Sequence, residues 1–279
     1  MYNILVPVDP SDYAEAAASV AVKIALHSRG KVTFMHLLAT PVDWVSLTVE
    51  EEGNFPEVKQ EITEAKAMLN RFKELANETG VQSEHVLEFS QEVKGIVDHA
   101  SKHGNDLIVM GSHGTSGVIG ALLGTKTQHV IRQATAPVLV VKQPIVDFPP
   151  KQVVFASSFR EEVGEAFAKI ASFVHMMGGY IKLLYVNDRE NFETTRRSKA
   201  RMAAFRQQCV HLACEQHVYN AENPEKGILQ FAEDQGADLI ALATHGRTGL
   251  AGMLKQSLTE QIVNHASLPV LSVHIETGS

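Results

Sequence analysis

The chain has two cysteines, no long apolar run and no surplus of basic residues, and each shortage excludes a class of protein. Cys209 and Cys214 are too few for the disulfide framework of a small secreted domain. No apolar run reaches the roughly 18 residues of a membrane-spanning helix, and residues 1–6 do not resemble a signal peptide. We therefore expect free thiols, a reducing cytoplasmic location and no membrane partner.

The charge balance argues against a nucleic-acid-binding protein. Lys and Arg number 25 against 32 Asp and Glu, which gives a formal net charge of -7, whereas such proteins usually carry a basic surplus. The hydrophobic fraction of 44% and the charged fraction of 20% are typical of a folded globular chain. A length of 279 residues allows either two ordinary domains or one large one.

An internal repeat decides between these two possibilities. Residues 104–142 align without gaps with residues 236–274 at a constant offset of 132, and about 15 of 39 positions are identical. A period this long excludes a solenoid, so each copy should be a complete domain. We predict one domain over residues 1–142, a linker over 143–150 and a second domain over 151–279. Three prolines within the linker favour an extended segment.

Within each copy, short β-rich runs alternate with amphipathic segments. The strands predicted in the first copy are 4–8, 32–38, 85–89, 106–110 and 138–141, with helices at 12–28, 56–79, 92–103 and 117–134. Strands at 153–156, 180–186, 217–220, 239–242 and 270–273 repeat this order, and Asn223 is a predicted helix N-cap. The predicted fold class is α/β: two tandem doubly wound domains, each a five-stranded parallel sheet with helices on both faces.

The segment after the fourth strand of the first copy carries a glycine pattern. Gly111, Gly114, Gly124 and Thr125 have the spacing G-x2-G-x9-G-[ST]. Glycines allow a backbone to approach a ligand, and a helix beginning behind Thr125 would bind phosphate groups at its N-terminus. Neither the P-loop pattern nor the dinucleotide fingerprint matches, because Lys126 does not directly follow Gly124 and the first strand leads into Asp9-Pro10-Ser11.

These motifs, together with the opening ILVPVD and the ending APVLVVK of the first copy, resemble the universal stress protein family over nearly the whole chain. The resemblance implies ATP binding in the first copy, with Mg²⁺ held only through the phosphates. By position, Pro7, Val8 and Asp9 would border the adenine, Met110 and Gly111 the ribose and base, and Gly114, Gly124 and Thr125 the phosphates.

Two further residues of the same segment are candidates. Lys126 either contributes a charge to the triphosphate or is a solvated lysine of the first helical turn. We interpret His113 as structural or ligand-lining rather than catalytic, since no nucleophile or acid partner is identifiable near it in the sequence.

The second copy lacks much of this pattern. Ala243 stands at the position of Gly111, Gln256 at that of Gly124 and Ser158 at that of Asp9. We expect weak or no ATP binding there, although Arg247 and Lys255 could hold another anion.

The leading functional interpretation is a nucleotide-binding regulatory protein in which ATP acts as a switch, with slow hydrolysis at most because no positioned base or arginine finger is identifiable. One alternative is a nucleotide-independent scaffold. Another is a transferase or hydrolase of the related α-hydrolase-like group, whose HxGH and SGGxD signatures are absent from the sequence.

The last strands of the two copies, 138–141 and 270–273, are apolar and suit edge-to-edge pairing. The family resemblance implies dimerisation there. The two copies could therefore pair within one chain, and two chains could form a homodimer, alongside a protein partner of unknown identity.

Three lesser features have ordinary interpretations. Glu50–Glu52 suit a solvated loop, and Trp44 suits a packing anchor better than a base contact. Cys209, His211, Cys214 and His217 do not have zinc-ligand spacing, so we expect helix-facing thiols and surface histidines.

Overall fold

A computed structural model describes residues 1–90, 94–112, 124–145, 148–159, 161–190, 192–207, 209, 212–244 and 257–275. The strands are β1 (Asn3–Pro7), β2 (Lys31–Leu38), β3 (Gln82–Phe89), β4 (Leu107–Gly111), β5 (Val138–Val141), β6 (Gln152–Ala156), β7 (Tyr180–Asn187), β8 (Cys214–Asn220), β9 (Leu239–Thr244) and β10 (Val270–His274). The helices are α1 (Asp12–Ser28), α2 (Val49–Glu52), α3 (Pro56–Glu78), α4 (Lys94–Lys102), α5 (Thr125–Gln133), α6 (Gly164–Met176), α7 (Thr195–Arg206), α8 (Pro224–Asp234) and α9 (Leu258–His265), with short 3-10 turns at Trp44–Ser46 and Glu161–Val163. No described helix is both long enough and apolar enough to cross a membrane.

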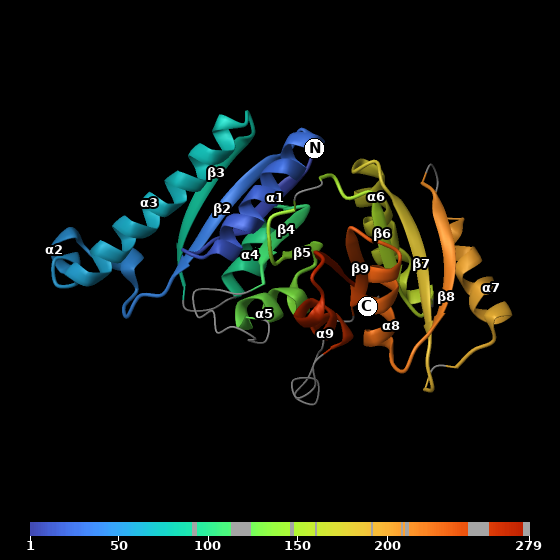
Figure 1. The fold of residues 1–279 in the computed structure, drawn as a ribbon. Helices are drawn as coiled ribbons and strands as arrows, with labels where there is room; N and C mark the ends of the chain where they lie inside the picture. The colour runs from blue at the N-terminus through green and yellow to red at the C-terminus, as the bar shows by residue number, and fades with distance from the viewer. Residues whose placement is uncertain are drawn as a thin grey trace.

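All ten strands belong to one sheet in the order β3-β2-β1-β4-β5-β10-β9-β6-β7-β8. Each half is parallel and doubly wound, because the chain turns back between β1 and β4 and again between β6 and β9. At the centre, β5 pairs antiparallel with β10, with Leu139 opposite Leu271 and Val140 opposite Val270. The two halves therefore lie side by side (Figure 1), with the carboxyl ends of their strands at opposite edges of the sheet.

Helices cover both faces of this sheet because the strand residues alternate between two hydrophobic clusters. Ile4 and Val6 belong to one cluster and Leu5 to the other. The first cluster takes its helical residues from α1, α3, α6 and α7, and the second from α4, α5, α8 and α9. Both faces are thus closed, as expected for parallel sheets.

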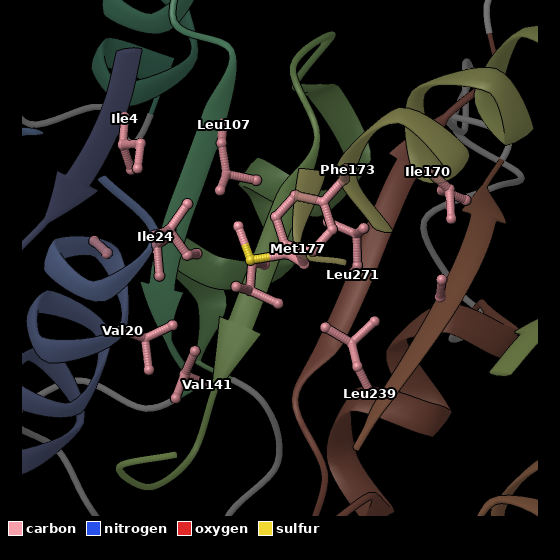
Figure 2. Close-up of a cluster of buried hydrophobic side chains, with 14 of the residues drawn as sticks. Ile4, Val20, Ile24, Leu107, Val141, Ile170, Phe173, Met177, Leu239 and Leu271 are labelled. Atoms are coloured by element: carbon pink, nitrogen blue, oxygen red, sulfur yellow. The ribbon is translucent and has the colours of Figure 1, made fainter. Parts of the chain in front are cut away.

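The first cluster continues without a break across the junction between the halves. In Figure 2, Val20 and Ile24 of α1 and Phe173 and Met177 of the second half converge over the central strands. The ring centroids of Tyr2 and Phe173 lie 6.4 Å apart in an edge-on arrangement. The two halves therefore share one core rather than touching only at their surfaces.

Two sequence expectations about helices require correction. Gly124 has φ -56° and ψ 140° and is the N-cap of α5, so the helix predicted over 117–134 does not run through it; residues 113–123 lie outside the described residues. Glu50–Glu52 belong to α2 rather than to a loop. Thr48 and Glu51 form a reciprocal capping box, which stabilises this short turn.

The expectation of two free thiols is wrong, because Cys209 and Cys214 form a disulfide. Cys209 follows α7 and Cys214 opens β8, and their Cα atoms lie 6.4 Å apart. The cysteines are therefore neither helix-facing thiols nor free ligands. The expectation of a reducing compartment loses the support that free thiols would have supplied.

The segment that we expect to be the linker is attached to the first half on its described parts. Lys23 Nζ donates a 2.7 Å hydrogen bond to the carbonyl oxygen of Ile145, and the rings of His27 and Phe148 meet edge-on at 6.4 Å. The domain boundaries themselves stay a prediction.

An ion pair joins the two halves on the face of the sheet that α4, α5, α8 and α9 cover. Arg132 of α5 donates from Nε and Nη2 to the two carboxylate oxygens of Glu260 in α9, at 2.7 and 2.8 Å. Glu260 is fully buried, and its hydrogen bonds raise the pKa of Arg132 above the usual value. A bidentate pair of this kind adds geometric specificity as well as energy.

Replacing Arg132 by Met should destabilise the protein by about 3 kcal/mol, because the carboxylate of Glu260 would remain buried without its partner. Urea denaturation followed by circular dichroism measures the change. The double variant Arg132→Met/Glu260→Met is the control and should recover most of the loss, since it leaves no unpaired charge. Equal stability of Arg132→Met and the parent chain would contradict this account.

Candidate functional site

A pocket of about 170 Å³ lies in the first half at the carboxyl edge of the sheet, between β1 and β4. This is the point where the strand order reverses, and ligands of open α/β sheets bind there. Eight of the residues selected from the sequence line it: Pro7, Val8, Asp9, Met110, Gly111, Gly124, Thr125 and Lys126. The other two, His113 and Gly114, lie outside the described residues.

The turn after β1 is held by hydrogen bonds that orient Asp9. The hydroxyl of Ser11 donates a hydrogen bond to Asp9 Oδ1. Ser11 Oγ in turn accepts a hydrogen bond from the N–H of Ala14 at 3.2 Å and so caps the N-terminus of α1. Nδ1 of His36 donates to the carbonyl oxygen of Val8 at 2.7 Å. Asp9 is thus a fixed carboxylate at the edge of the pocket.

The N-terminus of α5 supplies the opposite wall. Its N-cap is Gly124, and no side chain caps this helix. The N–H groups of a first turn have no intrahelical acceptor, and together with the helix dipole they favour an anion. Thr127 Oγ1 donates a 3.0 Å hydrogen bond to the carbonyl oxygen of Gly111 and so fixes this end of α5 against β4. Thr125 and Lys126 therefore bring the electrostatically positive end of a helix to the pocket.

Gly111 is required by packing rather than by ligand approach. A Cβ atom at this position would lie 2.7 Å from the backbone carbonyl atoms of Tyr13 in the first turn of α1. Gly124 has an ordinary negative φ of -56°, so a side chain at this position would not strain the backbone. Gly124 lines the pocket and is the N-cap of α5, so a side chain at this position would lie beside the N-terminus of that helix.

Gly111→Ala should lower the free energy of unfolding by about 1–3 kcal/mol, because the new methyl group overlaps the backbone of Tyr13. Chemical denaturation of the full chain measures this loss. Gly124→Ala, which needs no dihedral change, is the comparison and should cost less, under about 1 kcal/mol, because Ala is only a poorer N-cap than Gly. Equal effects of the two substitutions would contradict the packing explanation.

The equivalent helix in the second half differs in its first turn. The hydroxyl of Ser257 caps α9 by accepting from the N–H of Glu260 at 3.2 Å, and it donates to Glu260 Oε1 at 3.1 Å. The carboxylate of Glu260 also places a negative charge at the positive end of this helix. These contacts satisfy or neutralise the groups that α5 leaves available for an anion.

Sequence reasoning missed several lining residues of the first pocket. They are the apolar residues Ala14, Met35, Leu37 and Ile96 and the polar residue Thr127. In the sequence, the apolar wall residues have only the pattern of core positions in helices and strands. They lie close to the pocket because of the strand order, which the sequence pattern does not show. Thr127 lies in the first turn of the helix that begins at Thr125. Its place next to the predicted motif is the one sequence signal that could have identified it as a lining residue.

The fold and this pocket together define a class of protein: tandem doubly wound α/β domains with a ligand crevice at the strand-order reversal of the first. The universal stress protein family model matches residues 1–142 and 150–274. The chain therefore belongs to the universal stress protein family, a family with a role in the stress response.

Individual relatives are similar at the level of one domain and of two. The universal stress protein YxiE of Bacillus subtilis is 31% identical over 148 residues, which is 51% of this chain and 100% of the relative. A universal stress protein of Mycolicibacterium smegmatis is 26% identical over 295 residues, an alignment that covers 98% of this chain and 97% of the relative. The crystal structure of an Archaeoglobus fulgidus universal stress protein has a TM-score of 0.72 at 18% identity, with 98% and 96% coverage, and shows the shared fold.

Proposed function

We propose that the first domain binds ATP and that the bound nucleotide regulates the protein as a conformational switch in the stress response. The observation that carries this proposal is the pairing, in one pocket, of an apolar wall with an uncapped helix N-terminus. A purine base needs the first and a phosphate chain needs the second. Membership of the universal stress protein family supports a regulatory role in stress.

Each part of the pocket has a role in this proposal. Pro7, Val8 and Asp9 border the adenine, and the side chain of Met110 extends the apolar wall beside it. Gly124 and the first turn of α5 accept the phosphates, and Mg²⁺ binds through the phosphates alone.

The route from the pocket to the second domain runs along α5. Thr125 begins this helix in the pocket, and Arg132 in its last turn holds Glu260 of α9. A ligand that shifts the N-terminus of α5 would therefore bias the contact between the halves and the surface that a protein partner contacts. This coupling requires no chemical step, so we expect slow ATP hydrolysis at most.

Purified protein should release ATP or ADP when it is denatured. Protein that has been stripped of nucleotide and refolded should bind one ATP per chain. Gly124→Gln, which introduces the residue present in the second copy, should weaken ATP binding at least about tenfold, a loss of about 1.4 kcal/mol. Mass spectrometry of the released nucleotide and calorimetric titration measure these outcomes. Leu258→Gln is the matched control in the second domain, at the position equivalent to Lys126, and should leave ATP affinity unchanged.

Protein that carries no nucleotide and ignores added ATP would overturn the proposal. The nucleotide-independent scaffold would then be the better interpretation, with the continuous ten-stranded sheet as its framework. Stoichiometry of two ATP per chain would contradict the assignment of the site to the first domain alone.

A further inference from the structure

Two equivalent pockets lie along the boundary between the halves. The large seam pocket, of about 710 Å³, includes in its lining Asn105, Asp106, Thr135, Ala136 and Pro137. The small seam pocket, of about 210 Å³, includes Ala237, Asp238, Ser267, Leu268 and Pro269. Each residue of the second set follows its counterpart in the first at the repeat offset of 132. The two pockets are therefore the same place in the two copies, and they differ in what else lines them.

The linker lies along the small seam pocket. Residues 142–145 form part of its lining, and the described residues of the linker belong to neither a helix nor a strand. Lys23 Nζ of α1 holds the carbonyl oxygen of Ile145, and the side chains of Ile145 and Phe148 pack against the first hydrophobic cluster. At the end of the linker, the N–H of Lys151 donates to Asp238 at 2.8 Å. An apolar segment thus lies between α1 and the start of the second half.

The large seam pocket has the corresponding walls. Helix α6 follows the first strand of the second half as α1 follows that of the first, so α6 takes the place that α1 has beside the linker. This wall consists of Ala168, Lys169, Ser172 and Phe173, and Met1 and Tyr2 face it from the start of the first half. Ala168 and Ser172 are exposed. Within the described residues, no segment lines this pocket as the linker lines the small one.

The lining of the large seam pocket suits a peptide. Its apolar side chains include those of Tyr2, Leu107, Pro137 and Phe173. Asn105 is only 7% exposed, and its Oδ1 has no hydrogen-bond partner. A buried acceptor without a donor costs free energy, and a backbone N–H is a donor that an arriving peptide supplies. The pocket therefore offers apolar contacts together with one buried acceptor.

We propose that the large seam pocket binds an extended apolar segment of a partner protein, in the manner in which the small seam pocket holds the linker. Aliphatic and aromatic side chains of that segment pack against Tyr2 and Phe173, as Ile145 and Phe148 pack at the other seam. Asn105 Oδ1 accepts a backbone N–H of the segment. The partner thereby contacts both halves at once, and its binding does not require the proposed nucleotide.

A synthetic peptide with the sequence of residues 142–150, KQPIVDFPP, is the probe. Titration into the full chain should show saturable binding of one peptide per chain. The peptide KQPSVDSPP should bind at least about tenfold more weakly, because it lacks the two large apolar side chains. Gly124→Gln, which should lose ATP, should bind the probe as the parent does, so this site and the proposed nucleotide site are tested separately.

Ala168→Arg places a long side chain at an exposed lining position of α6 and should weaken probe binding at least about tenfold. Glu165→Arg, at an exposed position of the same helix outside the pocket lining, is the matched control and should leave the affinity unchanged. Asn105→Ala introduces the residue of the second copy and should weaken binding severalfold.

The absence of saturable binding, equal binding of the two peptides, or unchanged affinity in folded Ala168→Arg or Asn105→Ala would overturn the proposal. Tighter probe binding after removal of residues 276–279 would overturn it in favour of those residues as the occupant. A dimeric parent chain that becomes monomeric in Ala168→Arg would overturn it in favour of a second copy of the chain.

Discussion

The antiparallel pairing of β5 with β10 is the constraint on which the rest of this structure depends. An apolar strand at a sheet edge leaves backbone donors and acceptors unpaired, and each half covers the exposed edge of the other. The pairing also brings α5 beside α9 and merges the cores beneath α1 and α6 (Figure 2). One contact thereby turns two domains into a single ten-stranded framework with the carboxyl ends of its two halves at opposite edges.

The N-termini of α5 and α9 occupy equivalent positions in the two halves but have different roles. At α5, the glycine N-cap leaves the first-turn N–H groups free of side-chain caps, in a pocket that suits a phosphate chain. At α9, Ser257 and Glu260 occupy that turn, and Glu260 extends its carboxylate to Arg132 of the other half. The same glutamate that places a negative charge at the N-terminus of α9 therefore also links the two domains.

Much of the fold was predictable because buried strands carry a strong local signal. The central strands of both copies lie within a residue or two of the expected ranges, whereas β3 and β8 each begin three residues earlier than expected, at Gln82 and Cys214. These two are the outer strands, and their half-exposed faces carry polar residues that hide the pattern. The disulfide was missed because spacing alone does not show that the end of α7 lies beside the start of β8.

By itself, the sequence determined the tandem repeat, the α/β class and most residues of the first pocket, because motif spacing and hydrophobic periodicity are properties of the local chain. Only the tertiary structure decided that Tyr13 requires a glycine at position 111, that Glu260 meets Arg132, and that equivalent pockets lie along the boundary between the halves. These contacts join residues far apart in the chain, and their distances depend on strand order and helix packing, which no local pattern encodes.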